Sequence, residues 1–399
     1  MLTGHHFVPR ARFRVTIAGL RATRGRFGPR GGTRVTFQVP AKAPGRYRVR
    51  LFWRGRVTSL PFRITAAAPG PAPLLPEPQP EQPAQPEPPP PPPPPPDPPK
   101  LVAAGDIACS PNQEASKTDT ECHEAQTATL IDTLQPDAVA ALGDDQYEHV
   151  ELANFQAMYD PSWGAFKDIT FPAIGNHEYE GDPERDQDSG YFEYFGDAAG
   201  DPAKGYYRWS LGKWTIFVLN SGAIDYTVTG AGSAMPDDCW PVSCATGSAQ
   251  LDWLTGELDS LPEDACVLAY WHHPRFSSGF GDENQDYAET GPMYQALYDH
   301  GAELLLNGHA HNYERFEPVD PAGAPDAATG ITNFVVGTGG RSLFTQPGPQ
   351  EDISQTLYTD AFGVLELALQ PNGWSSRFVT EAGEVRDEAS GSCHGPPAA

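Results

Sequence analysis

Five short clusters of polar residues follow apolar runs between residues 100 and 315, and their side chains are of the types that bind metal ions or move protons. A glycine stands directly before the key residue in four of them, which lets the chain turn sharply at that point. Taken alone, each cluster has an ordinary explanation: a turn for Gly-Asp, a surface or core His for the next clusters, and two neighbours on one strand face for His309 and His311. Five in order within one unit predict a single site. The clusters are Gly105-Asp106, Gly143-Asp144-Asp145-Gln146-Tyr147, Gly175-Asn176-His177-Glu178, Trp271-His272-His273-Pro274 and Gly308-His309-Ala310-His311.

These residue types define the chemistry that we expect. Carboxylate oxygens, imidazole nitrogens and an amide oxygen suit iron, zinc or manganese, whereas magnesium and calcium prefer shells made of oxygen alone. The candidate ligands outnumber what one ion needs and would serve two ions that share a carboxylate. Two ions about 3.5–4 Å apart form the clamp used for in-line displacement at phosphorus. The residues therefore predict a dinuclear site for phosphate esters.

Strands must bring these clusters together. Apolar runs at 101–104, 138–142, 215–219, 267–271, 303–306, 333–336 and 363–369 predict strands, and helical patterning appears at 121–134, 248–261 and 292–300. Strands that alternate with helices predict a layered α/β fold. In such folds ligands bind outside the carboxyl ends of the strands, which is where the clusters lie.

Proline marks a clear boundary in the chain. Residues 69–99 hold 19 prolines in 31 positions, and we interpret the segment 66–99 as a stiff polyproline II linker. Alternating residues around 34–39, 47–53 and 60–65 predict strands before it, so we assign 1–65 to a small basic β-rich domain, which we interpret as incomplete. Residues 100–399 form the predicted catalytic domain.

The net charge of −25 hides an asymmetry, because residues 1–65 carry 15 Lys and Arg and no acidic residue. The remaining body is strongly acidic, so we expect no nucleic acid partner for it. The basic segment is a candidate for contact with an anionic surface. No apolar run is long enough for a membrane-spanning helix.

Six cysteines without a C-x-x-C pair favour disulfides over a structural zinc site. Neighbours in sequence suggest Cys109 with Cys122 and Cys239 with Cys244, which leaves Cys266 and Cys393, although six cysteines allow 15 pairings. Disulfides predict a secreted or cell-surface protein. No signal peptide is visible, and we interpret Met1 as not being the natural start.

The chain from 100 to about 345 resembles the calcineurin-like metallophosphoesterases and, within them, the purple acid phosphatases. Most of that superfamily carries Asp-x-His in the first motif, whereas Ala108 stands at the His position here. The second motif, from Gly143 to Tyr147, instead matches the purple acid phosphatase pattern Gly-Asp-x-x-Tyr, in which the Tyr binds the first metal. The resemblance implies a layered β-sandwich flanked by helices.

Carried across motif by motif, the resemblance implies a ligand set for two ions. Asp144 would bridge the ions, and His272 is chosen over His273 because Pro274 follows it in a His-x-Pro pattern. Ala269 departs from the usual Val-x-x-His. The first ion would take Asp106, Tyr147 and His311, and the second Asn176, His272 and His309. The family pairs Fe(III) with divalent Fe, Zn or Mn, and a phenolate at Tyr147 needs a strongly acidic cation.

The resemblance also implies roles in catalysis and substrate binding. His177 matches the family's outer-sphere His, which orients the phosphate or protonates the leaving oxygen. Asn176, His177 and His273 are the predicted substrate contacts. The alternative for His177 and His273 is packing that orients a ligand.

The leading hypothesis is an acid phosphatase-like hydrolase of phosphate monoesters, with attack by a metal-bound hydroxide. A second hypothesis is a phosphodiesterase or nucleotidase with the same metal site. A third, from another class, is a surface binding protein that uses an inactive phosphatase scaffold, which the basic segment and rigid linker motivate.

Overall fold

The computed structural model describes residues 97–115, 117–148, 150–179, 190–223, 239–279, 286–344, 346 and 348–397, and the backbone of strands between residues 2 and 64. Contacts divide the chain into two units, Met1–Pro92 and Pro93–Ala399. The expected linker at 66–99 lies outside the described residues up to position 96. None of the described helices is long and apolar enough to cross a membrane.

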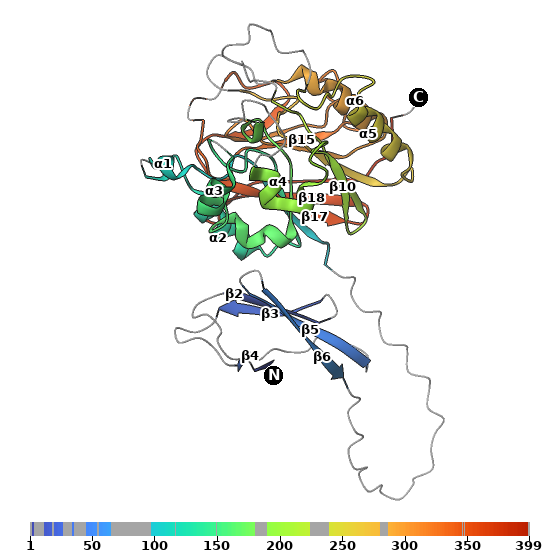
Figure 1. The fold of residues 1–399 in the computed structure, drawn as a ribbon. Helices are drawn as coiled ribbons and strands as arrows, with labels where there is room; N and C mark the ends of the chain where they lie inside the picture. Colours follow the sequence, from blue (N-terminus) through green and yellow to red (C-terminus); the bar gives the residue numbers. More distant parts are fainter. Residues whose placement is uncertain are drawn as a thin grey trace, which may run out of the picture. The chain divides into compact units, whose positions relative to one another are not determined.

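Two β-sheets form the second unit (Figure 1). The seven-stranded sheet contains, in spatial order, β10 (Tyr207–Leu211), β11 (Trp214–Val218), β12 (Cys266–Tyr270), β13 (Leu304–Asn307), β15 (Thr332–Val336), β14 (Tyr313–Phe316) and β16 (Ser354–Tyr358). The six-stranded sheet contains β19 (Val385–Ser392), β18 (Gly373–Thr380), β17 (Gly363–Gln370), β7 (Lys100–Ala104), β8 (Ala138–Ala141) and β9 (Thr170–Pro172). Neighbours run parallel from β7 to β9 and across β11, β12, β13 and β15.

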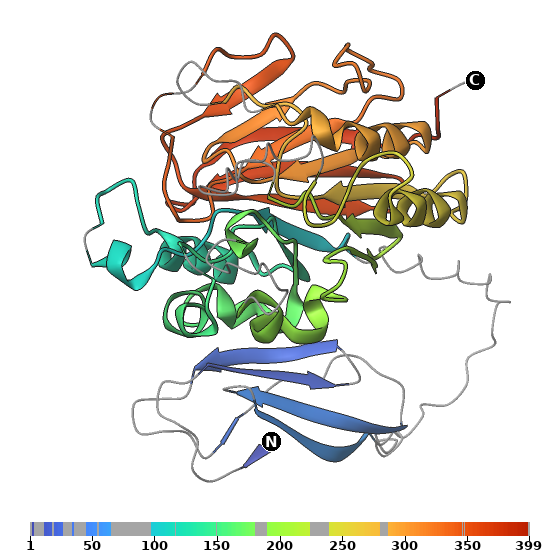
Figure 2. The same cartoon turned by 45° about the horizontal axis from the view of Figure 1, so that its top comes forward.

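Helices cover the outer sides of this pair of sheets. In Figures 1 and 2, α2 (Glu124–Leu134), α3 (Leu152–Asn154) and α4 (Gly190–Phe195) lie on one side, and α5 (Ala249–Asp259) and α6 (Gly291–Asp299) lie on the other. A short α1 (Pro111–Glu114) follows the loop after β7 and begins with a capping box at Ser110 and Gln113. The layered α/β fold expected from the sequence is confirmed.

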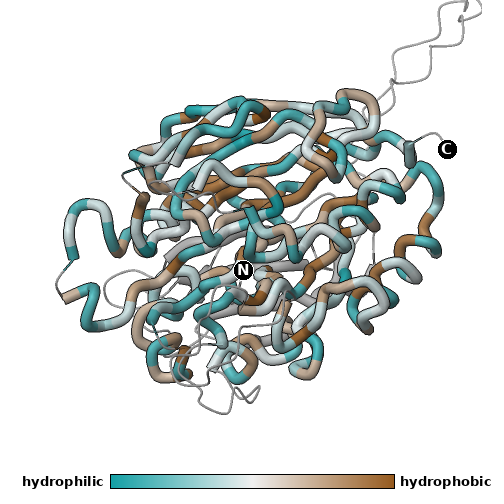
Figure 3. Tube along the Cα trace, turned by 90° about the horizontal axis from the view of Figure 1, so that it is seen from above, coloured by the Kyte–Doolittle hydropathy of each residue, from teal (hydrophilic) through white to brown (hydrophobic). Residues whose placement is uncertain are grey.

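Burial on both faces explains the continuous apolar runs of the parallel strands. In β12, Leu268 and Tyr270 join the hydrophobic cluster between the sheets, whereas Val267 and Ala269 join the cluster beneath α5 and α6. Hydrophobic stretches accordingly lie mostly in the interior of the trace, and hydrophilic stretches are frequent in the outer loops (Figure 3). The seven strands predicted in this unit are present within one or two residues at each end, while the helix predicted from Glu121 begins at Glu124.

The first unit is all-β. Strands β1 (Leu2–Thr3) and β4 (Arg34–Val35) pair, and β3 (Leu20–Arg26), β2 (Arg12–Ile17), β5 (Gly45–Trp53) and β6 (Arg56–Ile64) form an antiparallel sheet in that order. Its register sets Arg12 opposite Arg26, Arg14 opposite Arg24 and Arg46 opposite Arg63. Because residues two apart share a face and the register sets Arg21 opposite Thr16, one face of the sheet carries nine arginine positions. They are Arg12, Arg14, Arg21, Arg24, Arg26, Arg46, Arg48, Arg50 and Arg63.

Candidate metal centre

All five polar clusters lie at the carboxyl ends of parallel strands. Asp106, Asp144 and Asn176 follow β7, β8 and β9 of the six-stranded sheet, and His272 and His309 follow β12 and β13 of the seven-stranded sheet. Parallel strands end at the same edge, so the loops of both sheets converge there. The seven predicted ligands, which span residues 106 to 311, are thus brought together in one cluster.

Unusual backbone conformations aim three of these side chains. Asp106, Asp144 and His309 have φ values of 59°, 50° and 69°, in the left-handed region that L residues rarely adopt. Such residues persist only where the surrounding structure holds them, and they concentrate at functional sites. Left-handed backbone at three predicted ligands therefore supports a site that is held in place by its surroundings.

Two glycines permit the close approach of the loops. A Cβ on Gly175 would lie 2.2 Å from Asp144 Oδ1 and 2.4 Å from the Asp144 nitrogen. Gly143 has a φ of 91°, and its Cβ would lie 2.6 Å from His272 Nδ1. Any larger residue at either position would push a predicted ligand away.

Each aspartate uses one oxygen as an anchor and turns the other toward the cluster. Asp106 Oδ2 accepts a hydrogen bond from the His309 nitrogen at 2.8 Å, and Asp144 Oδ1 accepts one from the His177 nitrogen at 2.9 Å. The remaining oxygens, Asp106 Oδ1 and Asp144 Oδ2, each lie 2.8 Å from the hydroxyl of Tyr147. Both carboxylates are therefore fixed in orientation.

The donor atoms form two groups that share Asp144 Oδ2. In the first group, His311 Nε2 lies 3.1 Å from the Tyr147 hydroxyl and 3.2 Å from Asp106 Oδ1. In the second, His272 Nε2 lies 3.2 Å from Asp144 Oδ2 and 3.3 Å from His309 Nδ1. Asn176 Oδ1 completes the second group, 3.1 Å from His309 Nδ1.

The second nitrogen of each imidazole is bound outside the cluster. His272 Nδ1 donates to the Leu142 carbonyl at 2.9 Å, so the neutral ring presents a lone pair on Nε2. His311 Nδ1 lies 2.7 Å from the Ser342 hydroxyl, and His309 Nε2 lies 2.6 Å from the Tyr287 hydroxyl. Partners of this kind orient metal-binding imidazoles in proteins.

Glu178 ties two of the loops together. Its carboxylate accepts hydrogen bonds from the backbone nitrogens of Asp144 and Asp145, both at 2.9 Å, and of Gly175 at 2.7 Å. Burial and the nearby Asp144 charge raise the pKa of Glu178 to about 7. This side chain thus connects the loop that carries Asp144 with the loop that carries Asn176.

Electrostatics at the cluster follow from buried opposite charges. Burial opposes ionisation of Asp144, but His272 and His177 outweigh it and hold the pKa well below its usual range. Burial also opposes protonation of His272, yet Asp144 and Asp106 raise its pKa to about 9. Burial and the two aspartates raise the pKa of Tyr147 well above 10.

The donor set fits a pair of metal ions. Neighbouring oxygen and nitrogen atoms of the cluster lie 2.8–3.3 Å apart, and the Asp144 and Asp106 carboxylates that raise the His272 pKa favour a positive charge there. Asp144, His272 and His309 also have ligand atoms that all lie within 4.8 Å of one another. Mixed oxygen and nitrogen donors of this kind suit iron, zinc or manganese.

A cavity of about 280 Å³ opens onto the cluster. Asp106 and His272 are fully buried behind it, and so is His273, whose Nδ1 lies 2.9 Å from the Ser221 hydroxyl. His273 packs against His309, with ring centroids 4.5 Å apart. The cavity is lined by Asp144, Tyr147, Glu148, Asn176, His177, His309, His311, Arg341 and Phe344.

His177 and Asn176 are the predicted substrate contacts that line this cavity. His177 Nε2 lies 3.9 Å from Asp144 Oδ2, and its ring contacts that of Tyr147 with centroids 4.2 Å apart. The sequence did not single out Tyr287, Arg341 or Phe344. Tyr287 and Arg341 sit in loops whose position depends on distant contacts, so no local pattern marks them.

Three disulfides are present among the described residues, and they match the pairing expected from the sequence. They join Cys109 to Cys122, Cys239 to Cys244 and Cys266 to Cys393. The last links β12 to the end of β19, across 127 positions.

A family model described as calcineurin-like phosphoesterase matches residues 99–313. Purple acid phosphatase 15 of Arabidopsis thaliana is 24% identical over 273 residues, which are 60% of this chain and 45% of the relative. Acid phosphatase A of Cryphonectria parasitica is 27% identical over 149 residues, 35% of this chain and 29% of the relative. The chain thus spans less than half the length of these relatives.

Solved structures share the fold. The purple acid phosphatase PPD1 from yellow lupin (Lupinus luteus) seeds superposes with a TM-score of 0.56 at 16% identity, covering 98% of this chain and 71% of that one. PhoD superposes with a TM-score of 0.51 at 12% identity, covering 96% and 83%.

Proposed function

The chain belongs to the calcineurin-like phosphoesterase family, and from this premise we propose that it is a phosphatase that hydrolyses phosphate monoesters at a pair of metal ions. The observation that carries the proposal is the pair of donor groups that share Asp144 Oδ2. Acid phosphatases among its relatives support the choice of monoesters.

One ion would be held by Asp106, Tyr147 and His311, and the other by Asn176, His272 and His309, with Asp144 common to both. When bound, such a pair supplies Lewis acidity that polarises the phosphoryl group and activates water. Burial keeps the Tyr147 hydroxyl protonated in the metal-free cluster, so a phenolate ligand needs a strongly acidic cation. We propose Fe(III) with a divalent Fe, Zn or Mn.

The residues at the cavity would bind the ester and move its proton. Asn176 and His177 lie beside Asp144 at the cavity wall, where both can contact phosphate oxygens. We propose that His177 delivers a proton from Nε2 to the leaving oxygen, since that atom lies 3.9 Å from Asp144 Oδ2 and the side chain is partly exposed. His273, buried against His309, stays a prediction as a substrate contact.

Metal analysis with turnover tests this function. We expect two ions per chain and release of p-nitrophenol from p-nitrophenyl phosphate at a faster rate than from the bis-ester. Asp144→Asn should lose both ions and activity, while the exposed control Asp264→Asn should keep them. A visible charge-transfer colour that Tyr147→Phe abolishes would support iron. Two bound ions without hydrolysis of either ester between pH 4 and 9 would contradict the proposal and favour the binding-scaffold hypothesis, whereas preference for the bis-ester would favour the phosphodiesterase hypothesis.

We propose that the protein works in an oxidising compartment, outside the cell or at its surface. The three disulfides support this location, because such bonds persist where thiols are not kept reduced. Alkylation of the protein isolated from its host should leave all six cysteines unmodified unless a reductant is added first.

We further propose that residues 1–65 form a basic β domain that contacts an anionic surface. Nine arginine positions on one face of a sheet support this, since guanidinium groups bind carboxylate and phosphate in a forked geometry. Binding of the full chain to anionic lipid vesicles should fall when Arg14, Arg48 and Arg50 are replaced by Gln, and neutral vesicles should bind neither form. Equal binding by both forms would contradict this role.

A further inference from the structure

Arg341 is placed at the cavity by a loop that the mechanism above does not use. It follows β15 and two glycines, and its backbone nitrogen donates to the Asp106 carbonyl at 2.9 Å. Among the residues that line the described cavity it alone is a Lys or Arg. Its guanidinium lies over the Tyr147 ring, 5.1 Å from the centroid.

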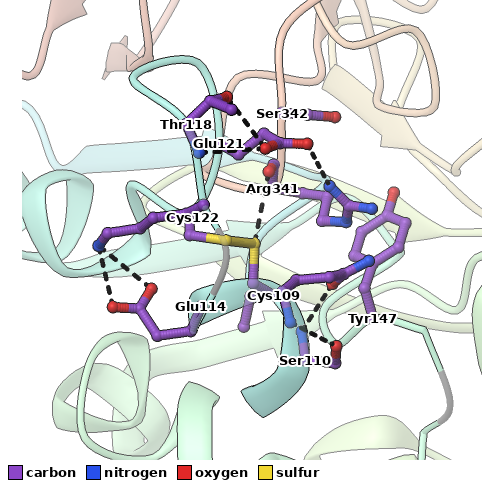
Figure 4. Close-up of a disulfide and its surroundings, with 12 residues drawn as sticks. Cys109, Ser110, Glu114, Thr118, Glu121, Cys122, Tyr147, Arg341 and Ser342 are labelled. Atoms are coloured by element: carbon purple, nitrogen blue, oxygen red, sulfur yellow. Dashed lines mark hydrogen bonds and ion pairs between the residues drawn. A yellow bond between two sulfur atoms is a disulfide. The ribbon is translucent and has the colours of Figure 1, made fainter.

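A disulfide holds this loop (Figure 4). Cys122, bonded to Cys109, donates from its backbone nitrogen to the Arg341 carbonyl at 3.1 Å. The next residue, Ser342, pairs with Glu121 in an isolated β-bridge. Arg341 is therefore anchored on both sides of its own position, and little conformational freedom is lost when its side chain binds a ligand.

The guanidinium retains unused hydrogen-bonding capacity. Nη2 donates to Glu148 Oε1 at 2.7 Å, while Glu121 stands 4.0 Å from Nη1, and Nε is buried with no acceptor among the described residues. An arginine offers five N–H donors in a fixed fork, so donors remain for an anion in the cavity.

Its location points to a particular part of the substrate. Tyr147 lies between the guanidinium and the donor cluster, because Arg341 covers the ring whose hydroxyl contacts Asp106 and Asp144. A phosphoryl group bound at the cluster would meet Asn176 and His177 first. Arg341 is thus offset from the scissile phosphate and within reach of a group on the leaving side.

We propose that Arg341 binds a second anionic group, a carboxylate or a phosphate, carried by the leaving group of the substrate. The preferred substrates would then be phosphomonoesters with a second negative charge near the scissile ester. This inference rests on the proposed phosphatase function and names its substrate class. Phe344, stacked on His311 with centroids 4.8 Å apart, forms the apolar wall beside this position.

The test compares glycerol 3-phosphate with 3-phosphoglycerate, which carries a carboxylate in place of a CH₂OH group. The wild type should have the higher kcat/KM for 3-phosphoglycerate. Arg341→Gln should lower that value about 10- to 100-fold, mainly through KM, because a charge-assisted hydrogen bond is lost. It should change glycerol 3-phosphate turnover less than about threefold, and Arg341→Lys should recover part of the loss.

Controls separate this inference from the function on which it rests. Arg377→Gln, which removes a partly exposed ion pair with Glu366, should leave both substrates unchanged. In the wild type, 3-phosphoglycerate should inhibit p-nitrophenyl phosphate hydrolysis more strongly than glycerol 3-phosphate does, and this comparison needs no variant. The role of Arg341 would be overturned if Arg341→Gln lowered kcat/KM equally for both esters, or if the wild type had equal kcat/KM for them. Neither result would contradict the proposed phosphatase function. Absence of all ester turnover would remove both.

Discussion

Gly175→Ala tests how tightly the two loops of the metal centre are packed. The added methyl group would start 2.2 Å from Asp144 Oδ1 and 2.4 Å from the Asp144 nitrogen, whereas ordinary contacts are about 3.4–4 Å. The Asp144 loop must therefore move by about 1 Å. Overpacking of this kind costs about 1–3 kcal/mol of unfolding free energy. A displacement of 1 Å at a reacting site lowers the rate about 100-fold.

The assay combines urea unfolding, metal titration and p-nitrophenyl phosphate turnover on the same preparations. Gly256→Ala is the matched control, because its Cβ would meet nothing within 4 Å. In the interior of α5 this control should stabilise the protein by about 0.5–1 kcal/mol. If Gly175→Ala kept wild-type stability, two ions and full activity, the close approach of Gly175 to Asp144 would not constrain the site, and our reasoning on the loop geometry would be wrong.

Three further predictions concern charge and crosslinks. Burial raises the pKa of Glu303 from 4.5 to about 8, so the stability that this group contributes is present below pH 4.5 and is lost as the pH rises through 8. The unfolding free energy of Glu303→Gln, measured in urea titrations, should therefore rise by roughly 3–5 kcal/mol relative to that of the wild type between pH 4 and pH 9. Parallel curves of unfolding free energy against pH would contradict this. Replacing Cys266 and Cys393 together by Ser should lower the unfolding free energy by about 2–5 kcal/mol, measured against the unreduced wild type, and an unchanged urea midpoint would argue against a stabilising bond. Metal uptake at pH 7 should release a proton from His272, whose pKa is about 9 without metal, so calorimetric heats should scale with buffer ionisation enthalpy; buffer-independent heats would refute this.

The sequence predicts the strands that bear ligands because they are buried on both faces. Residues 304–307 of β13 are almost entirely shielded and read as an uninterrupted apolar run apart from Asn307. Strand β19, by contrast, is polar and largely exposed, and its sequence carries no strand signal. Its place at the edge of the sheet comes from pairing with β18.

The predicted ligands could be found because each lies within two to six residues after the end of a strand. Other parts of the centre depend on contacts between distant loops. Arg341 reaches the cavity through hydrogen bonds to Asp106 and Cys122, and Tyr287 meets His309 from a loop that ends just before α6. Neither relation leaves a local pattern in the sequence, so only the folded chain reveals them.

The metal centre draws its donors from two separate sheets, and this has a consequence for the whole sandwich. Asp106 and Asp144 follow strands of the six-stranded sheet, and His272 and His309 follow strands of the seven-stranded sheet. Contacts near 3 Å join the two pairs, from Asp144 to His272 and from Asp106 to His309. If one sheet slid past the other, the donor atoms would move apart, so cations bound there would hold the two sheets in a single alignment. Substitutions deep between the sheets, far from any ligand, should consequently register as altered ion affinity.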